Sequence, residues 1–150
     1  MDLKINGAIK SAEELVKSLN EATEDVTLVI NSPGGSVLEG LQVVNAIRNC
    51  KQKVTAKVEV MACSMAGVVA LACHRLIMHK DDLLMLHNCM SYAEGNKEEI
   101  ANAIESMKAI DAVLHSIVME HAKDKTLDAR IDNGEVWPVS YTHLRAHETK

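Results

Sequence analysis

A serine and a histidine in this chain each follow an apolar run, where a nucleophile and a general base could meet. Ser64 stands in MACSMAG, between a strand-like run and a run of small residues, and His87 ends the apolar stretch LLMLHN. An imidazole beside a serine hydroxyl takes its proton as the oxygen attacks a carbonyl carbon. The pair therefore predicts acyl-transfer chemistry. The structural alternatives are that Ser64 is only a helix N-cap and that His87 is a structural histidine.

The stretch INSPGGSVLEG (30–40) contains two consecutive glycines whose backbone N–H groups no side chain covers. A tetrahedral intermediate of acyl transfer needs two N–H donors for its oxyanion. The N–H groups of Gly35 and of Met65, directly after the serine, are candidates for these donors. A simple glycine turn after a strand is the structural alternative.

Hydrophobic periodicity predicts alternating strands and helices that bring these residues together. We expect strands over 2–9, 25–31, 53–62, 75–80 and 82–88, and helices over 11–22, 36–50, 64–74 and 96–123. Ser11 and Glu14 have the spacing of a capping box for the first helix. Alternation of this kind implies parallel βαβ units and an α/β fold. Ligands bind at the carboxyl ends of such strands, where the PGG loop, Ser64 and His87 all fall.

Composition excludes several function classes. The 150 residues suit one domain, and a net charge of −5 without a basic tract argues against nucleic-acid or anionic-membrane binding. The four cysteines match no CxxC pattern, and no metal-ligand spacing or phosphate loop is visible, so no cofactor is expected. The start of the chain lacks a signal-peptide pattern, and the longest apolar stretch (58–73) is too short to span a bilayer. A reducing cytoplasm is the simplest location.

The ordered segments INSPGGSVLEGLQVVNAI, ACSMAG and LMLHN resemble the Clp protease proteolytic subunit family, especially its phage and prophage members. The resemblance extends from about residue 3 to about residue 137. It implies the α/β fold that this family shares with crotonases, built from repeated βαβ units in a spiral with a long handle helix, here 96–123. It also implies a serine endopeptidase with Ser64 as nucleophile and His87 as base.

The resemblance assigns further roles. It implies that Gly35 and Met65 supply the oxyanion N–H groups and that Gly34 and Ser36 flank the bound substrate strand. The third triad residue falls in DNGEVW, where Glu135 occupies a position that is usually Asp in the family. Asp132 is the alternative acid, in which case Glu135 is no more than an exposed loop carboxylate.

Partners are also implied by the resemblance. The family binds peptides or proteins in extended form and assembles as stacked heptameric rings, so a homo-oligomer is expected. A partner AAA+ unfoldase and the processing of phage prohead proteins are both compatible contexts. The apolar stripe of 96–123 fits either ring-to-ring contacts or simple packing on the sheet. The stripe consists of Ile100, Ile104, Met107, Ile110, Val113, Leu114, Ile117 and Val118.

Four other interpretations stay open. A crotonase-type acyl-CoA enzyme would share the fold and the two-amide oxyanion hole. A signal-peptide-peptidase relative would use a Ser–Lys pair instead. A ring subunit without activity would follow if the acid is missing or misplaced. Cys63, next to Ser64, is an alternative nucleophile, although its side chain is expected to point to the opposite side.

The last segment, PVSYTHLRAHETK (138–150), departs from the family after Trp137. It has no apolar periodicity and resembles the translated read-through of a sequencing-library adapter. We therefore expect a peptidase domain over 1–137, truncated at its C-terminus, and a tail over 138–150 that is an assembly artefact. A genuine divergent tail is the alternative.

Overall fold

The computed structural model of the chain describes residues 1–137. Their strands are β1 (Asp2–Asn6), β2 (Val26–Ser32), β3 (Val54–Cys63), β4 (Arg75–Ile77) and β5 (Leu83–Met85). Their helices are α1 (Glu13–Asn20), α2 (Val37–Asn49), α3 (Met65–Ala72), α4 (Lys97–Met119) and α5 (Leu127–Asp132). The predicted α/β alternation is confirmed. Helix α5 was not predicted from the sequence, because six residues are too few to give a periodic pattern. The predicted tail, 138–150, lies outside the described residues.

All strand pairs of the sheet are parallel. The order is β1-β2-β3-β4, and β5 also pairs with β3. Strand β3 is long enough to serve two neighbours, since β4 pairs with Thr55–Lys57 and β5 pairs with Met61–Cys63. Strands β2, β3 and β5 therefore all direct their carboxyl ends toward one edge of the sheet.

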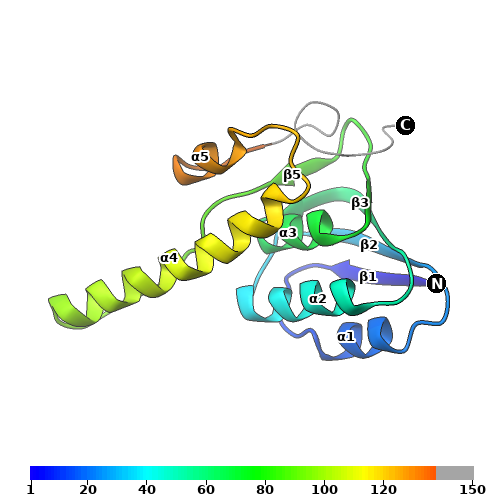
Figure 1. Ribbon diagram of the computed structural model, residues 1–150, viewed down its shortest axis with the longest axis horizontal. Helices are drawn as coiled ribbons and strands as arrows, with labels where there is room; N and C mark the ends of the chain where they lie inside the picture. The colour runs from blue at the N-terminus through cyan, green and yellow to red at the C-terminus, as the bar shows by residue number, and fades with distance from the viewer. Residues whose placement is uncertain (138–150) are drawn as a thin grey trace.

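One face of the sheet is covered by helices. In β2, alternate residues from Val26 to Ser32 are buried, whereas those between them are only half-buried. Helices α1, α2 and α3 lie in a row along the buried face (Figure 1). Every residue of α3 is buried, as the all-apolar sequence of this segment predicts. Among the described helices, none combines the length and the apolar character needed to cross a membrane.

The predicted capping box of the first helix is wrong. Helix α1 begins at Glu13, its N-cap residue is Ala12, and no side chain of that residue caps it. The N–H of Ala12 donates instead to the Glu39 carboxylate at 2.7 Å. The acceptor thus comes from α2, 27 residues further along the chain, and the Ser11 hydroxyl only accepts from the Glu13 N–H at 3.5 Å.

Helix α4 projects from the body of the molecule over its N-terminal half (Figure 1). Leu114, Ile117 and Val118 are buried near its C-terminal end, where it packs against α3. By contrast, Ile100 and Ile104 are 39% and 48% exposed. The expectation that the whole apolar stripe packs on the sheet is therefore wrong. Helix α3 lies under one end of α4, and no described part of the sheet lies under the other end.

Strand β3 contains a strained bulge just before Ser64. Ile30 pairs with Val58, but Ser32 pairs with Ala62, so β3 has two more residues than β2 over this interval. Val60 stands in the bulge with φ 75° and with 57% of its surface exposed. Its N–H donates to Asp82 at 3.0 Å, which holds the bulge open. A β-branched residue is unfavourable at positive φ because its side chain crowds the backbone.

Replacing Val60 by glycine is expected to stabilise the protein. Relief of the left-handed conformation contributes about 1–2 kcal/mol, and the added freedom of glycine in the unfolded chain costs about 0.5–1 kcal/mol. We therefore expect the free energy of unfolding in urea to rise by roughly 0.5–1 kcal/mol at unchanged m value. Val60→Ala is the matched control, since it keeps a Cβ and gains little. A glycine variant less stable than the alanine variant would contradict the strain argument.

Candidate active site

Ser64 occupies a tight elbow between β3 and α3. Its backbone has φ 55° and ψ −128°, and its side chain caps no N–H of α3, although it stands at the N-cap position. The backbone is nevertheless fixed, because its N–H donates to Met85 at 2.8 Å and its carbonyl accepts from Gly67 and Val68. A serine held in this strained way, with its hydroxyl unused by the helix, is suited to chemistry rather than to capping.

The PGG loop packs directly against this elbow. A Cβ added at Gly34, where φ is +102°, would lie 2.7 Å from the Ser64 Cβ and 2.8 Å from the Cys63 carbonyl oxygen. A Cβ at Gly35, where φ is +151°, would lie 2.4 Å from the Ile9 carbonyl oxygen. Both glycines are therefore required, since any side chain would separate the loop from Ser64 or from Ile9.

Gly34→Ala is expected to lower the free energy of unfolding by about 2–5 kcal/mol, from crowding of about 1–3 kcal/mol and conformational strain of about 1–2 kcal/mol. Gly7→Ala is the control. Gly7 also has positive φ, at +80°, but nothing lies within 4 Å of its added Cβ. It should therefore show the strain alone in the same urea titration. Equal losses for the two variants would mean that the contact with Ser64 is not tight.

Within residues 1–137, two backbone N–H groups beside Ser64 have no hydrogen-bond acceptor. Ile9 is bonded to the carbonyl of Gly34 and to the N–H of Ser36. In an extended chain the N–H of the intervening residue, Gly35, points to the opposite side. Met65 is the first residue of α3, so its N–H has no acceptor within the helix. Since a Cβ on Gly34 would lie 3.1 Å from the Met65 nitrogen, the two N–H groups are neighbours.

A small cavity of about 90 Å³ brings four of the predicted residues together, but Glu135, Gly34 and Ser36 are not among those that line it. Ser64, Met65, Gly35 and His87 all line it. The rest of its wall is formed by Val37, Val68, Cys89, Met90 and Leu114. The PGG loop, the serine elbow and the histidine, which are far apart in sequence, thus surround one space.

His87 lies at the end of the β5 segment and is half-buried. Its Nδ1 contacts the carbonyl oxygen of Asn88, the next residue. A carbonyl can only accept, so Nδ1 is the donor in this contact, and in the neutral form of the ring Nε2 is then the nitrogen without a proton. This is the tautomer that can remove a proton from a hydroxyl.

Glu135 lies across from His87 on an antiparallel segment. Leu86 and Val136 exchange both backbone hydrogen bonds, at 2.9 and 2.8 Å. His87 and Glu135 are the next residues on the two segments, so their backbones lie side by side directly after this single bridge. Glu135 is exposed, and within the described residues no hydrogen bond joins its carboxylate to His87.

The alternative acid and the alternative nucleophile lie in other surroundings. Asp132 accepts a hydrogen bond from the Asn88 side chain at 3.1 Å and lies 3.8 Å from Nε2 of His115. The Cys63 side chain is buried and does not line the cavity. Its burial, and secondarily the negative charge of Glu135, raise the pKa of the Cys63 thiol, which disfavours the nucleophilic thiolate.

A larger groove of about 500 Å³ adjoins the small cavity and shares Gly35, Val37, Cys89 and Met90 with it. It runs from the start of α2 to the projecting part of α4. Its remaining wall consists of Ser36, Leu38, Ser91, Ala103, Ser106, Met107 and Ile110. Ser36 caps α2 by accepting from the Glu39 N–H at 3.3 Å. The groove is mostly apolar and opens beside Ser64.

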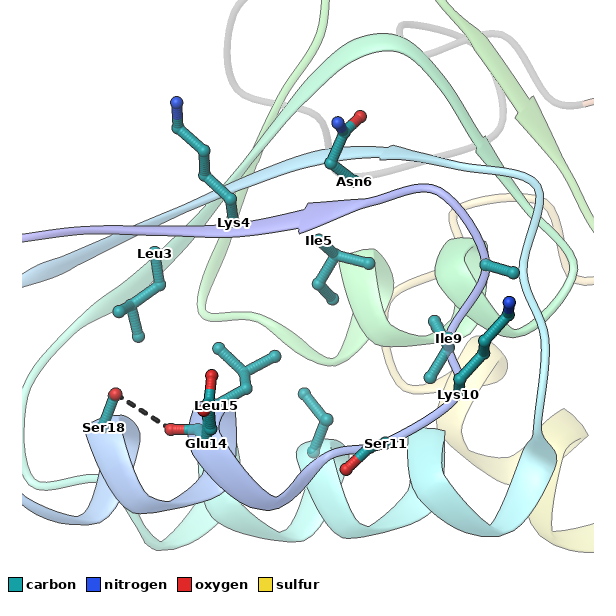
Figure 2. Close-up of a pocket in the computed structure, with 12 residues that line it drawn as sticks. Leu3, Lys4, Ile5, Asn6, Ile9, Lys10, Ser11, Glu14, Leu15 and Ser18 are labelled. Carbon is teal, nitrogen blue, oxygen red and sulfur yellow. Dashed lines mark hydrogen bonds between the residues drawn. The ribbon is translucent and has the colours of Figure 1, made fainter.

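Another cavity, of about 420 Å³, lies between β1 and α1, away from these residues. Figure 2 shows Leu3 and Ile5 of β1 facing Leu15 of α1 across it, whereas the Lys4 side chain points away from α1. None of the residues that line it is a histidine or a cysteine. Its size therefore does not make it a candidate for the serine chemistry.

One group of side chains has ligand types suited to a metal ion. His115, Asp128 and Asp132 each bring one ligand atom within 4.8 Å of the others. Both ring nitrogens of His115 already contact oxygen atoms, Nδ1 that of Asp128 and Nε2 that of Asn88 at 2.7 Å. Neither Asn88 nor His115 is among the residues predicted for the site. The position of Asn88 directly after His87 is a sequence signal that could have placed it at the site. Nothing in the sequence links His115 to the site.

Comparison with known proteins places this geometry in context. The family profile described as Clp protease matches residues 6–133. The chain is similar to the ATP-dependent Clp protease proteolytic subunit of Carsonella ruddii, with 30% identity over 80% of this chain and 66% of the relative. The subunit of Cyanophora paradoxa is 26% identical over 85% of this chain and 66% of its own length. The subunit of Streptococcus pneumoniae is 30% identical over 92% of this chain and 70% of its own length. The chain thus spans just under two thirds of the first two relatives.

Proposed function

Because the chain belongs to the Clp protease family, we propose that it is a serine endopeptidase in which Ser64 is the nucleophile, His87 the general base and Glu135 the acid. The supporting observation is the cavity that Ser64 and His87 share, together with the Ser64 hydroxyl that caps no helix N–H. Among the described residues, no lysine lines this cavity, so a Ser–Lys mechanism is disfavoured. Family membership also sets aside the crotonase-type alternative.

In the proposed reaction, Nε2 of His87 takes the Ser64 proton as Oγ attacks the carbonyl carbon of the scissile peptide bond. The intermediate collapses when the imidazolium gives this proton to the leaving amine, which leaves an acyl-enzyme. A water molecule, activated by the same nitrogen, then releases the acid product. Glu135, across from His87, would stabilise the imidazolium in both steps.

The oxyanion would be held by the N–H groups of Gly35 and Met65. Both are backbone groups fixed by the packing of Gly34 on the Ser64 elbow, so they need no rearrangement during the reaction. Donors of this kind are typically worth about 3–4 kcal/mol each in transition-state stabilisation. The N-terminus of α3 adds a favourable dipole at the same point.

The substrate would be an extended peptide that runs along the 34–36 segment. The groove of about 500 Å³ next to the small cavity would take an apolar side chain, because Leu38, Met90, Met107 and Ile110 form much of its wall. Two of these residues are long methionines that adapt to side chains of different shape. We therefore propose cleavage beside a medium-sized apolar residue.

Assembly and partners follow from the relatives. Their names describe ATP-dependent proteolytic subunits. We propose that this chain forms a homo-oligomeric ring and receives unfolded protein from an ATPase of the unfoldase type. The exposed apolar residues of α4 would lie in contacts between subunits. Processing of prohead proteins without an ATPase is the alternative context.

An inactive ring subunit is the second candidate. It is favoured by one observation, which is that Nδ1 of His87 contacts the Asn88 carbonyl and not Glu135. In such a subunit the groove would bind peptides without cleaving them.

A fluorophosphonate probe tests the proposal. It reacts only with an activated serine, so one adduct per chain in the intact mass, mapped by digestion to the peptide that carries Ser64, is the expected result. Ser36→Ala is the matched control, since Ser36 lies at the same site but caps α2, and it should still be labelled. An adduct on another residue would assign the nucleophile to that residue, and no adduct at all on folded protein would favour the inactive subunit.

A further inference from the structure

Two ties between separate segments bracket the facing pair of His87 and Glu135. Before the pair, Leu86 and Val136 exchange two backbone hydrogen bonds. After it, the side-chain amide nitrogen of Asn88 donates to Asp132 at 3.1 Å. Asp132 precedes Glu135 by three residues, so the two ties hold both ends of the short stretch in which base and acid face each other. Only the second tie is made by side chains.

The second tie is braced from α4. Nε2 of His115 contacts Oδ1 of Asn88 at 2.7 Å, and Nδ1 of His115 contacts the carboxylate of Asp128. Asp128 and Asp132 are four residues apart on α5 and so lie on one face of that helix. The adjacent face is anchored by the buried residues Leu127 and Ile131. The His115 side chain is itself only 13% exposed and follows the buried Leu114 on α4.

The orientation of the Asn88 side chain is determined by this arrangement. Because its nitrogen donates to Asp132, its oxygen must face His115, and Nε2 of His115 must be the donor. The carboxylate of Asp128 is likewise an acceptor for Nδ1. The carbonyl of the same Asn88 accepts from Nδ1 of His87, so the braced residue also holds the proposed base.

We propose that His115 is a positioning residue for His87, acting through Asn88. It fixes Asn88 against α5, and Asn88 in turn sets the tautomer of His87 and its distance from Glu135. This inference rests on the proposed serine peptidase function for its kinetic consequence, but the tautomer of His87 can be observed without any activity. Helix α4 would thereby connect the surface of its projecting part to the geometry of the site.

A pair of substitutions separates positioning from simple stability. The amide nitrogen of asparagine reaches the place of Nδ1, and that of glutamine reaches the place of Nε2. His115→Asn therefore keeps the donor to Asp128 and loses the donor to Asn88, whereas His115→Gln does the reverse. Each variant loses one hydrogen bond, so their melting temperatures should fall by similar amounts.

Kinetics and nitrogen-15 NMR give the two readouts. In His115→Asn we expect kcat for a fluorogenic peptide to fall about 10- to 100-fold, as for a slight misplacement of a reacting group, with KM unchanged. In His115→Gln we expect it to stay within about threefold of the parent chain. The ring nitrogens of His87 should report a protonated Nδ1 in the parent and in His115→Gln, and a mixture of tautomers in His115→Asn.

The outcomes separate the two proposals. If the parent chain neither hydrolyses peptides nor reacts with the fluorophosphonate, but the tautomer of His87 shifts only in His115→Asn, the peptidase proposal fails and the positioning proposal stands. If His87 keeps its tautomer in both variants, or if the two variants lose activity equally, the positioning proposal is overturned.

Discussion

Replacing Ser64 by alanine is expected to lower the turnover of a fluorogenic peptide by at least about 10⁴-fold. The substitution removes the attacking oxygen. A water molecule in the same place would not fully replace it as the nucleophile. The fold should survive, because the Ser64 side chain caps no helix N–H and its backbone contacts to Met85 and Gly67 do not depend on the hydroxyl. Circular dichroism and the elution volume in gel filtration check that the fold and assembly are kept.

Cys63→Ala is the matched control for that experiment. It changes the neighbouring residue by a similar volume, but the thiol is buried and burial raises its pKa. Turnover should therefore remain close to that of the parent chain. If Ser64→Ala kept its activity and Cys63→Ala lost it, the thiol would be the nucleophile and the serine only a helix cap.

The strands and most helices were predictable because each has a simple pattern of apolar residues. The order β1-β2-β3-β4 also follows from alternation, since parallel βαβ units place successive strands side by side, whereas the pairing of β5 with β3 does not follow from it. This is why the amino-acid sequence alone places the PGG loop, Ser64 and His87 at one edge of the sheet. Their meeting around one small cavity depends further on Gly34, whose missing side chain lets the loop touch the elbow.

Other features depend on contacts that no local pattern contains. The Glu39 carboxylate accepts from the N–H of Ala12, the N-cap residue of α1, from 27 residues away. The brace between His115 and Asn88 also spans 27 residues. The stripe of α4 is helical throughout, but its sequence does not tell how far the body of the molecule extends beneath it. In each of these cases a contact between segments far apart in the sequence decides the role of a residue. Hydrophobic periodicity does not predict such contacts.

Glu135→Gln is expected to lower kcat for the same peptide by about 10²-fold or more. Glu135 faces His87 across the Leu86–Val136 pair, where its carboxylate can stabilise the imidazolium that forms during the reaction. The Asn88 carbonyl already fixes the tautomer, but it has no net charge to offset the positive ring. Glutamine keeps the shape of the side chain and removes that charge alone. Binding of the peptide, and therefore KM, should change little.

Asp132→Asn is the matched control, and it decides which carboxylate is the acid. Asparagine retains a carbonyl oxygen that can accept from the Asn88 side chain, so the tie to α5 persists without the charge. Turnover should then stay within about threefold of the parent chain. A large loss in Asp132→Asn with none in Glu135→Gln would assign the acid to α5. No loss in either would mean that the neutral Asn88 carbonyl is sufficient, and that this chain works with a serine, a histidine and a backbone acceptor.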